Sequence, residues 1–166
     1  MTKIVLFIKI VLIGVGSCLI FDIWQRVFQK ITAIPPSDWG EAGRWCIGLF
    51  REFRLFMDDT NSSKAYPNEV VAGWLLHYVV AIFYVIVFEI VTSSGFLEPS
   101  IISGFIFGAI SVIIPWFFFL PCLGKGIMGS RTRNPILVCF LTLKMHSLFG
   151  ASIGVGYTFF EIYDQY

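Results

Sequence analysis

Three side chains that can bind ligands or protons lie inside long apolar segments: Asp22, His77 and His146. An ionisable group in the hydrocarbon of a bilayer is unfavourable unless it is paired or lines a cavity, so such residues indicate a functional site. Two imidazoles and a carboxylate could ligate a transition metal, and two imidazoles alone could hold a haem iron. The same groups could relay protons or hold a small polar solute. They could also form a hydrogen-bonded network that joins helices and holds no ligand.

The three residues are predicted to lie at similar depth. At a rise of about 1.5 Å per residue, Asp22 falls about 9 Å, His77 about 11 Å and His146 about 15 Å from the basic ends of their segments. The first segment runs toward the basic side and the other two run away from it, so all three residues reach the same half of the bilayer. Thr142, His146 and Gly150 share one helical face, which points His146 inward. We therefore predict one shared pocket, with a proton or small polar solute as the leading ligand and a metal as the alternative.

Two arginines lie in the basic loops, Arg44 beside Trp45 and Arg131 beside Thr132. Guanidinium groups suit phosphate and carboxylate. We predict that Arg44 and Arg131 converge at the cytoplasmic mouth and bind an anion there. The alternative is the ordinary positive charge of cytoplasmic loops.

Glycine spacing predicts close helix packing. Gly104 and Gly108 form one GxxxG motif, and Gly150 and Gly154 form another. Small residues at this spacing let helix backbones approach closely in lipid. The favoured interpretation is packing of the third helix on the fourth within one chain, and the alternative is the face of a homo-oligomer.

Other signals of chemistry are weak. The four cysteines contain no CxxC pair, so their spacing indicates neither a zinc site nor a redox motif. The four are Cys18, Cys46, Cys122 and Cys139. The residues before Cys18 are similar to a lipoprotein cleavage site, but the apolar run continues beyond it, which favours an uncleaved first helix. Glu89 is expected to be solvated. There is no nucleophile elbow, P-loop, dinucleotide fingerprint or protease zinc motif, so an enzyme is not favoured and no cofactor is assigned.

Four apolar stretches must position these residues. The chain has 166 residues, of which 57% are hydrophobic and 14% charged, whereas soluble domains carry about 25% charged residues. A spanning helix needs about 20 apolar residues. The stretches run over about residues 4–28, 70–91, 101–123 and 136–160. The chain is therefore predicted to be all-α, a single polytopic membrane domain over residues 1–166 that forms a four-helix bundle in the lipid bilayer. Its net charge is +1, which gives no indication either way about nucleic acid. The basic residues form no tract that could follow phosphates, so nucleic acid is not expected as a partner.

The basic residues predict an orientation. Nine lysines and arginines lie in or beside the loops that join the first to the second stretch and the third to the fourth, against Lys3 and Lys9 on the other side. Positive residues favour the cytoplasmic side, so both termini are predicted outside the cytoplasm. All five tryptophans lie toward the basic side, as in an interfacial belt.

The first basic loop contains a segment over about residues 39–57 in which aromatic and charged residues alternate. This pattern suits a helix in the headgroup region, with aromatic side chains toward the lipid and arginines toward phosphates. A cap packed over the mouth of the bundle is the alternative.

An ordered set of short motifs resembles a known family. The motifs are Asp22-x-Trp24, Trp39 followed by Gly43-Arg44-Trp45, Glu69 with Gly73-Trp74-x-x-His77-Tyr78, Pro121-x-x-Gly124-x-Gly126, Ser130-Arg131-Thr132 and His146-x-x-Phe149-Gly150. Together, over about residues 10–160, they resemble an uncharacterised family of small bacterial inner-membrane proteins, a domain of unknown function. The resemblance implies a bacterial inner membrane and supplies no activity.

The chain departs from that family at two points. The family has histidines after the Gly-Arg-Trp motif, but residues 46–57 here contain none, which weakens the metal hypothesis. The family has proline soon after Ser-Arg-Thr, whereas Arg133 and Asn134 precede Pro135 here.

Three classes of function follow. The leading hypothesis is a transport or binding protein for a proton or small polar solute. The second is a structural or partner-binding membrane subunit without a ligand. The third is a membrane-embedded enzyme that acts on lipid or quinone, or a metal- or haem-binding protein.

Overall fold

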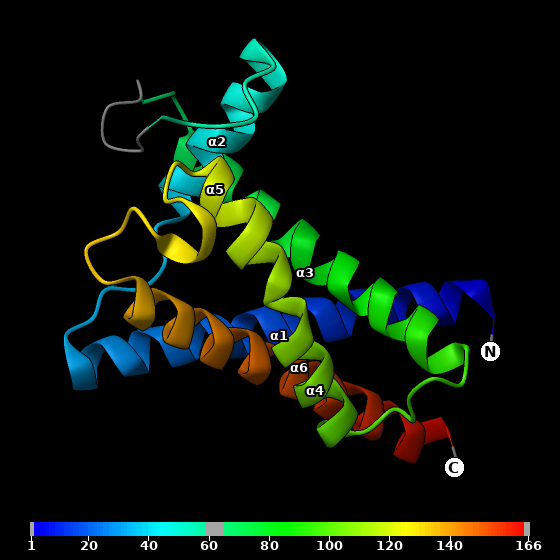
Figure 1. Ribbon diagram of the computed structural model, residues 1–166. Helices are drawn as coiled ribbons and strands as arrows, with labels where there is room; N and C mark the ends of the chain where they lie inside the picture. Colours follow the sequence, from blue (N-terminus) through cyan, green and yellow to red (C-terminus); the bar gives the residue numbers. More distant parts are fainter. Residues whose placement is uncertain (1, 59–64, 165–166) are drawn as a thin grey trace. The chain divides into compact units, whose positions relative to one another are not determined.

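The computed structural model describes residues 2–58 and 65–164, apart from the side chains of residues 161–164. All regular secondary structure in these residues is helical (Figure 1). Four helical spans are long and apolar enough to cross a membrane: Lys3–Thr32, Glu69–Ser93, Ile101–Cys122 and Pro135–Phe160. The predicted all-α class with four spanning helices is confirmed.

Local capping sets where two of the helices begin. Helix α1 (Lys3–Thr32) carries the first span, and α2 (Trp39–Glu52) follows after a short connection. The Asp38 carboxylate accepts a hydrogen bond of 2.8 Å from the N–H of Gly40 at the start of α2. Helix α3 (Glu69–Ser93) is the second span. Helix α6 (Pro135–Asp164) begins with proline, which suits the first helical position because its missing N–H would have no partner there.

The third span is not one regular α-helix. Helix α4 (Ile101–Ser111) is followed by the π-helix η1 (Pro115–Phe119) and the short α5 (Leu120–Cys122). Proline lacks the backbone N–H that continues the α-helical hydrogen bonds, so a change of helix type at Pro115 has a direct cause. The turn η2 (Ile127–Gly129) lies between α5 and α6.

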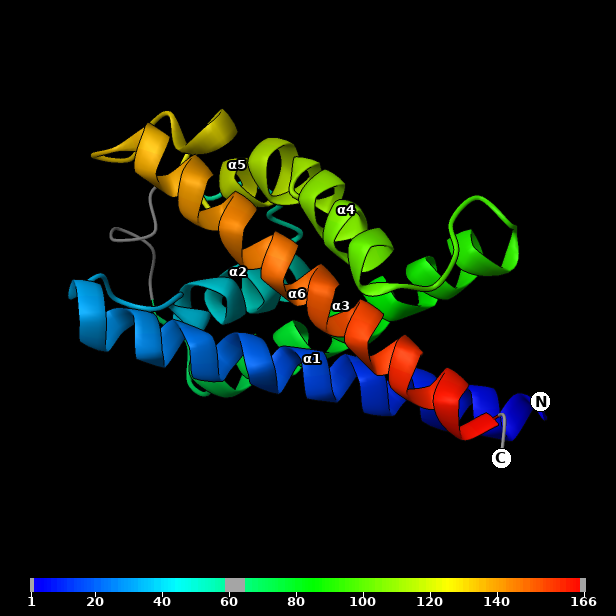
Figure 2. The same ribbon diagram turned by 90° about the horizontal axis from the view of Figure 1, so that it is seen from below.

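The chain divides into two compact units. Unit 1 contains Met1–Pro36, Tyr78–Ile110 and Met145–Tyr166, and unit 2 contains Ser37–His77 and Ser111–Lys144. In unit 1, α1 begins and α6 ends at the same end (Figures 1 and 2).

The core of unit 1 joins α1, α3 and α6. Its fully buried side chains include Cys18, Val85, Phe88 and Ile153. Phe88 packs edge-on against Tyr157, with ring centroids 5.1 Å apart. Many large apolar side chains on the outer faces of these helices are exposed, as expected for surfaces that contact lipid.

Glycines bring α4 and α6 into contact within unit 1, and Figure 2 shows the two helices side by side. A Cβ placed on Gly108 would lie 2.9 Å from the Cα of Gly150, and one placed on Gly104 would lie 2.8 Å from the nitrogen of Gly154. Real Cβ atoms essentially never approach so closely, so larger residues would push the backbones apart. The close approach of the two GxxxG motifs is made within one chain.

Unit 2 packs α2 on the first turns of α3. A Cβ on Gly43 would lie 2.6 Å from the nitrogen of Gly73, so these helices also touch at glycine. The indole N–H of Trp45 donates a hydrogen bond of 2.8 Å to the carbonyl of Leu55, which ties the segment after α2 to the helix. Lys125 and Glu41 form an ion pair between the α5–η2 loop and α2.

Candidate functional site

Helix α1 presents two polar residues on one buried face. Cys18 and Asp22 are one turn apart, and their exposed fractions are 0% and 9%. The Tyr78 hydroxyl of α3 donates a hydrogen bond of 3.3 Å to a carboxylate oxygen of Asp22. A carboxylate removed from water needs such donors, so Tyr78 both satisfies and orients Asp22.

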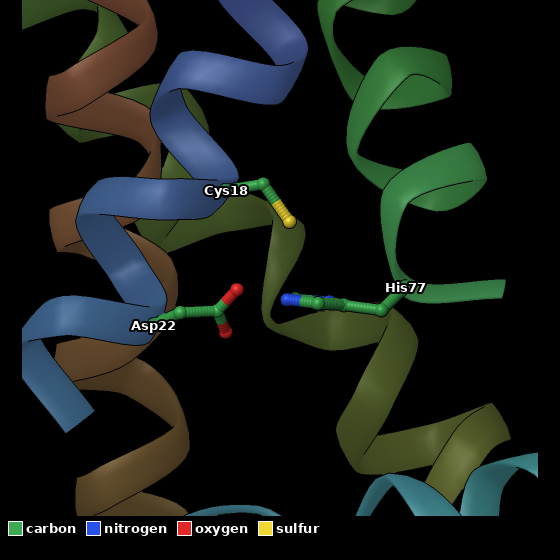
Figure 3. A group of neighbouring side chains, drawn as sticks. All are labelled: Cys18, Asp22 and His77. Carbon is green, nitrogen blue, oxygen red and sulfur yellow. The ribbon is translucent and has the colours of Figure 1, made fainter. Parts of the chain in front are cut away.

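His77 immediately precedes Tyr78 on α3. Unit 2 ends at His77 and the α3 segment of unit 1 begins at Tyr78, but the helix is continuous through both residues. One potential ligand atom from each of Cys18, Asp22 and His77 lies within 4.8 Å of the others (Figure 3). The group therefore offers a thiol, a carboxylate and an imidazole, from two helices.

Two tryptophans hold the His77 ring. Trp39 of α2 stacks on the imidazole with ring centroids 3.7 Å apart and an angle of 22° between the planes. Trp74, in the preceding turn of α3, contacts His77 edge-on at 5.9 Å. Because these contacts lie within unit 2, the packing of α2 on α3 fixes the plane of the imidazole.

Arg44 is engaged within the chain. Its guanidinium donates hydrogen bonds of 2.9 and 2.8 Å to the two carboxylate oxygens of Glu69, at the start of α3. The hydrogen bond to Glu69 raises the pKa of Arg44 and outweighs the opposing effect of burial, so this pair remains charged. Arg131, the other predicted anion-binding residue, is exposed. Convergence of Arg44 and Arg131 on an anion stays a prediction.

His146 is placed differently from the other two predicted pocket residues. Its ring packs edge-on against Tyr84 of α3, with centroids 5.9 Å apart. Among the described residues, the group of potential metal ligands contains Asp22 and His77 but not His146. The structure thus brings together two of the three predicted residues and adds Cys18.

Two residues of this group were not chosen from the sequence. Cys18 lies four residues before Asp22, and this i, i+4 spacing was the available signal, because it places both side chains on one helical face. Tyr78 had no such signal, since its contact with Asp22 joins residues 56 positions apart. Glu89, expected to be solvated, is half-buried and accepts a hydrogen bond of 2.6 Å from Tyr157, a residue that is 1% exposed.

Four apolar helical spans, with a cluster of polar side chains of which Cys18 and Asp22 are buried and His77 is half-buried, define an α-helical multi-pass membrane protein. The chain belongs to the family described as "Protein of unknown function (DUF2938)", which matches residues 11–158. No curated protein and no solved structure matches the chain.

Proposed function

We propose that this membrane protein binds a transition-metal ion within its membrane-spanning part, through Cys18, Asp22 and His77. The observation that carries the proposal is the approach of the three potential ligand atoms to within 4.8 Å of one another. Ligands to Zn²⁺ lie about 2.0–2.3 Å from the ion, so neighbouring ligands are roughly 3–4 Å apart. Small side-chain rotations would close the group around an ion.

The mixture of donors favours particular metals. Thiolate and imidazole suit Zn²⁺, copper, iron and nickel, whereas Mg²⁺ and Ca²⁺ prefer oxygen ligands. Three protein ligands leave a further coordination position for water or a second ligand. Binding would require loss of the Cys18 thiol proton, so metal uptake would release a proton.

Residues around the group support the metal proposal. The Tyr78 hydroxyl donates to Asp22, and Trp39 stacks on His77. Contacts of this kind orient metal ligands and strengthen binding. The side chains of Asp22 and His77 would therefore lose little conformational freedom when the metal binds.

A proton or small polar solute is the second candidate. Buried polar side chains continue along α1 on both sides of Cys18, and those of Lys9, Ser17, Asp22 and Gln25 are 3–9% exposed. Such a series could form part of a polar path through unit 1. In this candidate, Asp22 would accept the proton or contact the solute.

For either candidate, we place the protein in a bacterial inner membrane with both termini outside the cytoplasm.

The test is metal binding by the full chain in detergent. We expect purified protein to bind Co²⁺ with the absorption of thiolate coordination, and Zn²⁺ to displace it. Cys18→Ser, Asp22→Asn and His77→Gln should each weaken binding by more than about 100-fold, since removal of a mere supporting contact already costs 10–100-fold. Cys46→Ser and His146→Gln are matched controls that should bind as the unmodified protein does.

Three outcomes separate the hypotheses. Loss of binding in only the three ligand variants supports the metal site. Absence of metal binding, together with proton or solute movement in vesicles that depends on Asp22, would replace it with the second candidate. Absence of both, with lowered thermal stability in the ligand variants, would leave a structural network.

A further inference from the structure

The C-terminal end of α2 and the segment after it expose three phenylalanines. The exposed fractions of Phe50, Phe53 and Phe56 are 77%, 90% and 59%. All three lie in unit 2, and Figure 1 shows that this end of α2, in cyan, extends past α5. Single exposed apolar residues are ordinary, but several large ones along so short a segment mark a contact surface. We call Phe50, Phe53 and Phe56 the phenylalanine patch.

The other aromatic side chains over residues 39–57 pack inside unit 2. Trp45 is 8% exposed and packs edge-on against Phe119 of η1, with ring centroids 5.3 Å apart. Trp39 stacks on His77 of α3. The first part of α2 is therefore a cap packed on α3 and η1, and the phenylalanine patch contains the aromatic side chains that stay exposed.

Phe53 occupies a strained backbone position. It is the C-cap of α2, in the left-handed region with φ 52° and ψ 28°, and its N–H donates a hydrogen bond to the carbonyl of Gly48. Glycine fits this position without strain and is common at helix ends for that reason. A bulky ring that is strained and 90% exposed is unfavourable in water on both counts. Such strain persists where another contact compensates for it.

The place of α2 in the chain indicates which surface the patch meets. Residues 33–38 alone separate the first span from α2, and Gly43 of α2 packs on Gly73 in the first turns of α3. The 25 residues of α3 are about 38 Å long, more than the roughly 30 Å of hydrocarbon, so the ends of α3 extend into the headgroup regions. A helix that touches the first turns of α3 therefore lies at the level of the lipid headgroups.

An arginine beside the patch carries the charge that attracts phosphate. Arg51 is exposed, and its guanidinium carbon lies 6.0 Å from the centroid of the Tyr66 ring. The neighbouring Glu52 is engaged within unit 2, because it accepts a hydrogen bond from the Tyr66 hydroxyl and pairs with Arg54 at 3.3 Å. A guanidinium group suits phosphate, and helices at a membrane surface combine apolar rings toward the lipid with basic residues toward the phosphates.

We propose that the phenylalanine patch inserts into the lipid bilayer at the boundary between headgroups and acyl chains, with Arg51 at the phosphates. Insertion removes the three rings from water, which is favourable and compensates for the strain at Phe53. The bilayer is the partner because α2 lies at the level of the headgroups and because Arg51 accompanies the apolar rings. A second copy of the chain is the alternative occupant, and the test separates the two.

The test is the accessibility of a nitroxide label in the full chain, in nanodiscs of phosphatidylethanolamine and phosphatidylglycerol. A nitroxide amino acid replaces Phe50, Phe53, Leu12 or Asp58, one in each variant, so that the native cysteines stay. Oxygen concentrates in lipid and a nickel chelate stays in water, so each relaxes only the labels that it reaches.

The labels at Phe50 and Phe53 should respond to oxygen and lose the response to nickel. The label at Leu12, which is 56% exposed on the first span, is the control for lipid and should behave in the same way. The label at Asp58, which is exposed, is the control for water and should respond to nickel.

Changes at Arg51 test the contact with phosphate. Arg51→Glu should restore the nickel response of the label at Phe53, because phosphates repel a carboxylate. Arg51→Lys keeps the positive charge, so the nickel response should stay lost. The absence of any effect of Arg51→Glu would overturn the role of Arg51.

Two results would overturn insertion of the patch. A nickel response at Phe50 and Phe53 equal to that at Asp58 would show that the patch faces water. Loss of both responses would show that protein, such as a second copy of the chain, covers the patch. If the variant labelled at Phe53 does not fold, the label at Phe50 decides alone. None of these results depends on metal binding at Cys18, so this proposal and the proposed function can fail separately.

Discussion

The Tyr78 hydroxyl of α3 donates a hydrogen bond of 3.3 Å to the buried carboxylate of Asp22 on α1. If this bond orients Asp22 for a metal, Tyr78→Phe should weaken Co²⁺ and Zn²⁺ binding by about 10–100-fold while the stoichiometry is kept. Metal titrations of the two proteins would measure the change. Tyr84→Phe, which changes another tyrosine of α3 that is buried, is the matched control. Equal affinity of Tyr78→Phe and the unmodified protein would mean that the bond has no role in binding.

The contact between Gly108 and Gly150 predicts a stability effect. A Cβ on Gly108 would lie 2.9 Å from the Cα of Gly150, whereas one on Gly16 of α1 would meet nothing within 4 Å. Overpacking typically costs about 1–3 kcal/mol, so Gly108→Ala should lower the thermal unfolding temperature of the protein in detergent. Gly16→Ala should change it little or raise it, since alanine favours helix over glycine.

A larger residue extends the same test to the oligomeric state. Gly108→Leu should destabilise the single chain more than Gly108→Ala does. If these glycines instead form a face between two copies, the leucine variant would leave the chain stable and lower only its oligomeric state, which light scattering in detergent would detect.

The pair of Arg44 and Glu69 should contribute more to stability than the pair of Arg54 and Glu52. The first pair is bidentate, with side chains 17% and 16% exposed, and the second is a contact of 3.3 Å with side chains 37% and 49% exposed. Loss of one partner of a partly buried charged pair leaves an uncompensated charge. We expect Arg44→Gln to lower the free energy of unfolding by about 1–3 kcal/mol, and Arg54→Gln by at most about 1 kcal/mol.

A lysine variant adds a geometric test of that pair. Arg44→Lys keeps the charge but loses the planar fork that binds both oxygens of Glu69. It should recover only part of the loss seen in Arg44→Gln. Full recovery in thermal unfolding would mean that charge alone matters and that the bidentate geometry does not.

The orientation of the chain is a separate prediction. Nine basic residues against two predict that both termini lie outside the cytoplasm. A reporter that is active only outside the cytoplasm should be active when it is fused after Tyr166, and a cytoplasmic reporter at the same point should be inactive. The reverse pattern would show that Lys3 and Lys9 outweigh the basic loops.

The sequence by itself determined the class of fold. Runs of about 20 apolar residues can bury their backbone polar groups in lipid only as helices, and this local rule predicted four spanning helices before any contact was known. The same local rules were enough to indicate that Asp22 and His77 need partners, because an ionisable side chain in an apolar run is unfavourable wherever the chain folds.

Only the tertiary structure decided which partners those residues have. Tyr78 reaches Asp22 across 56 residues of sequence, and Trp39 stacks on His77 because α2 packs on α3. His146 instead meets Tyr84, since depth along a helix does not fix the direction of a side chain around it. Tyr157 of α6 meets Lys9 of α1 with its ring and Glu89 of α3 with its hydroxyl, at distances that helix packing sets.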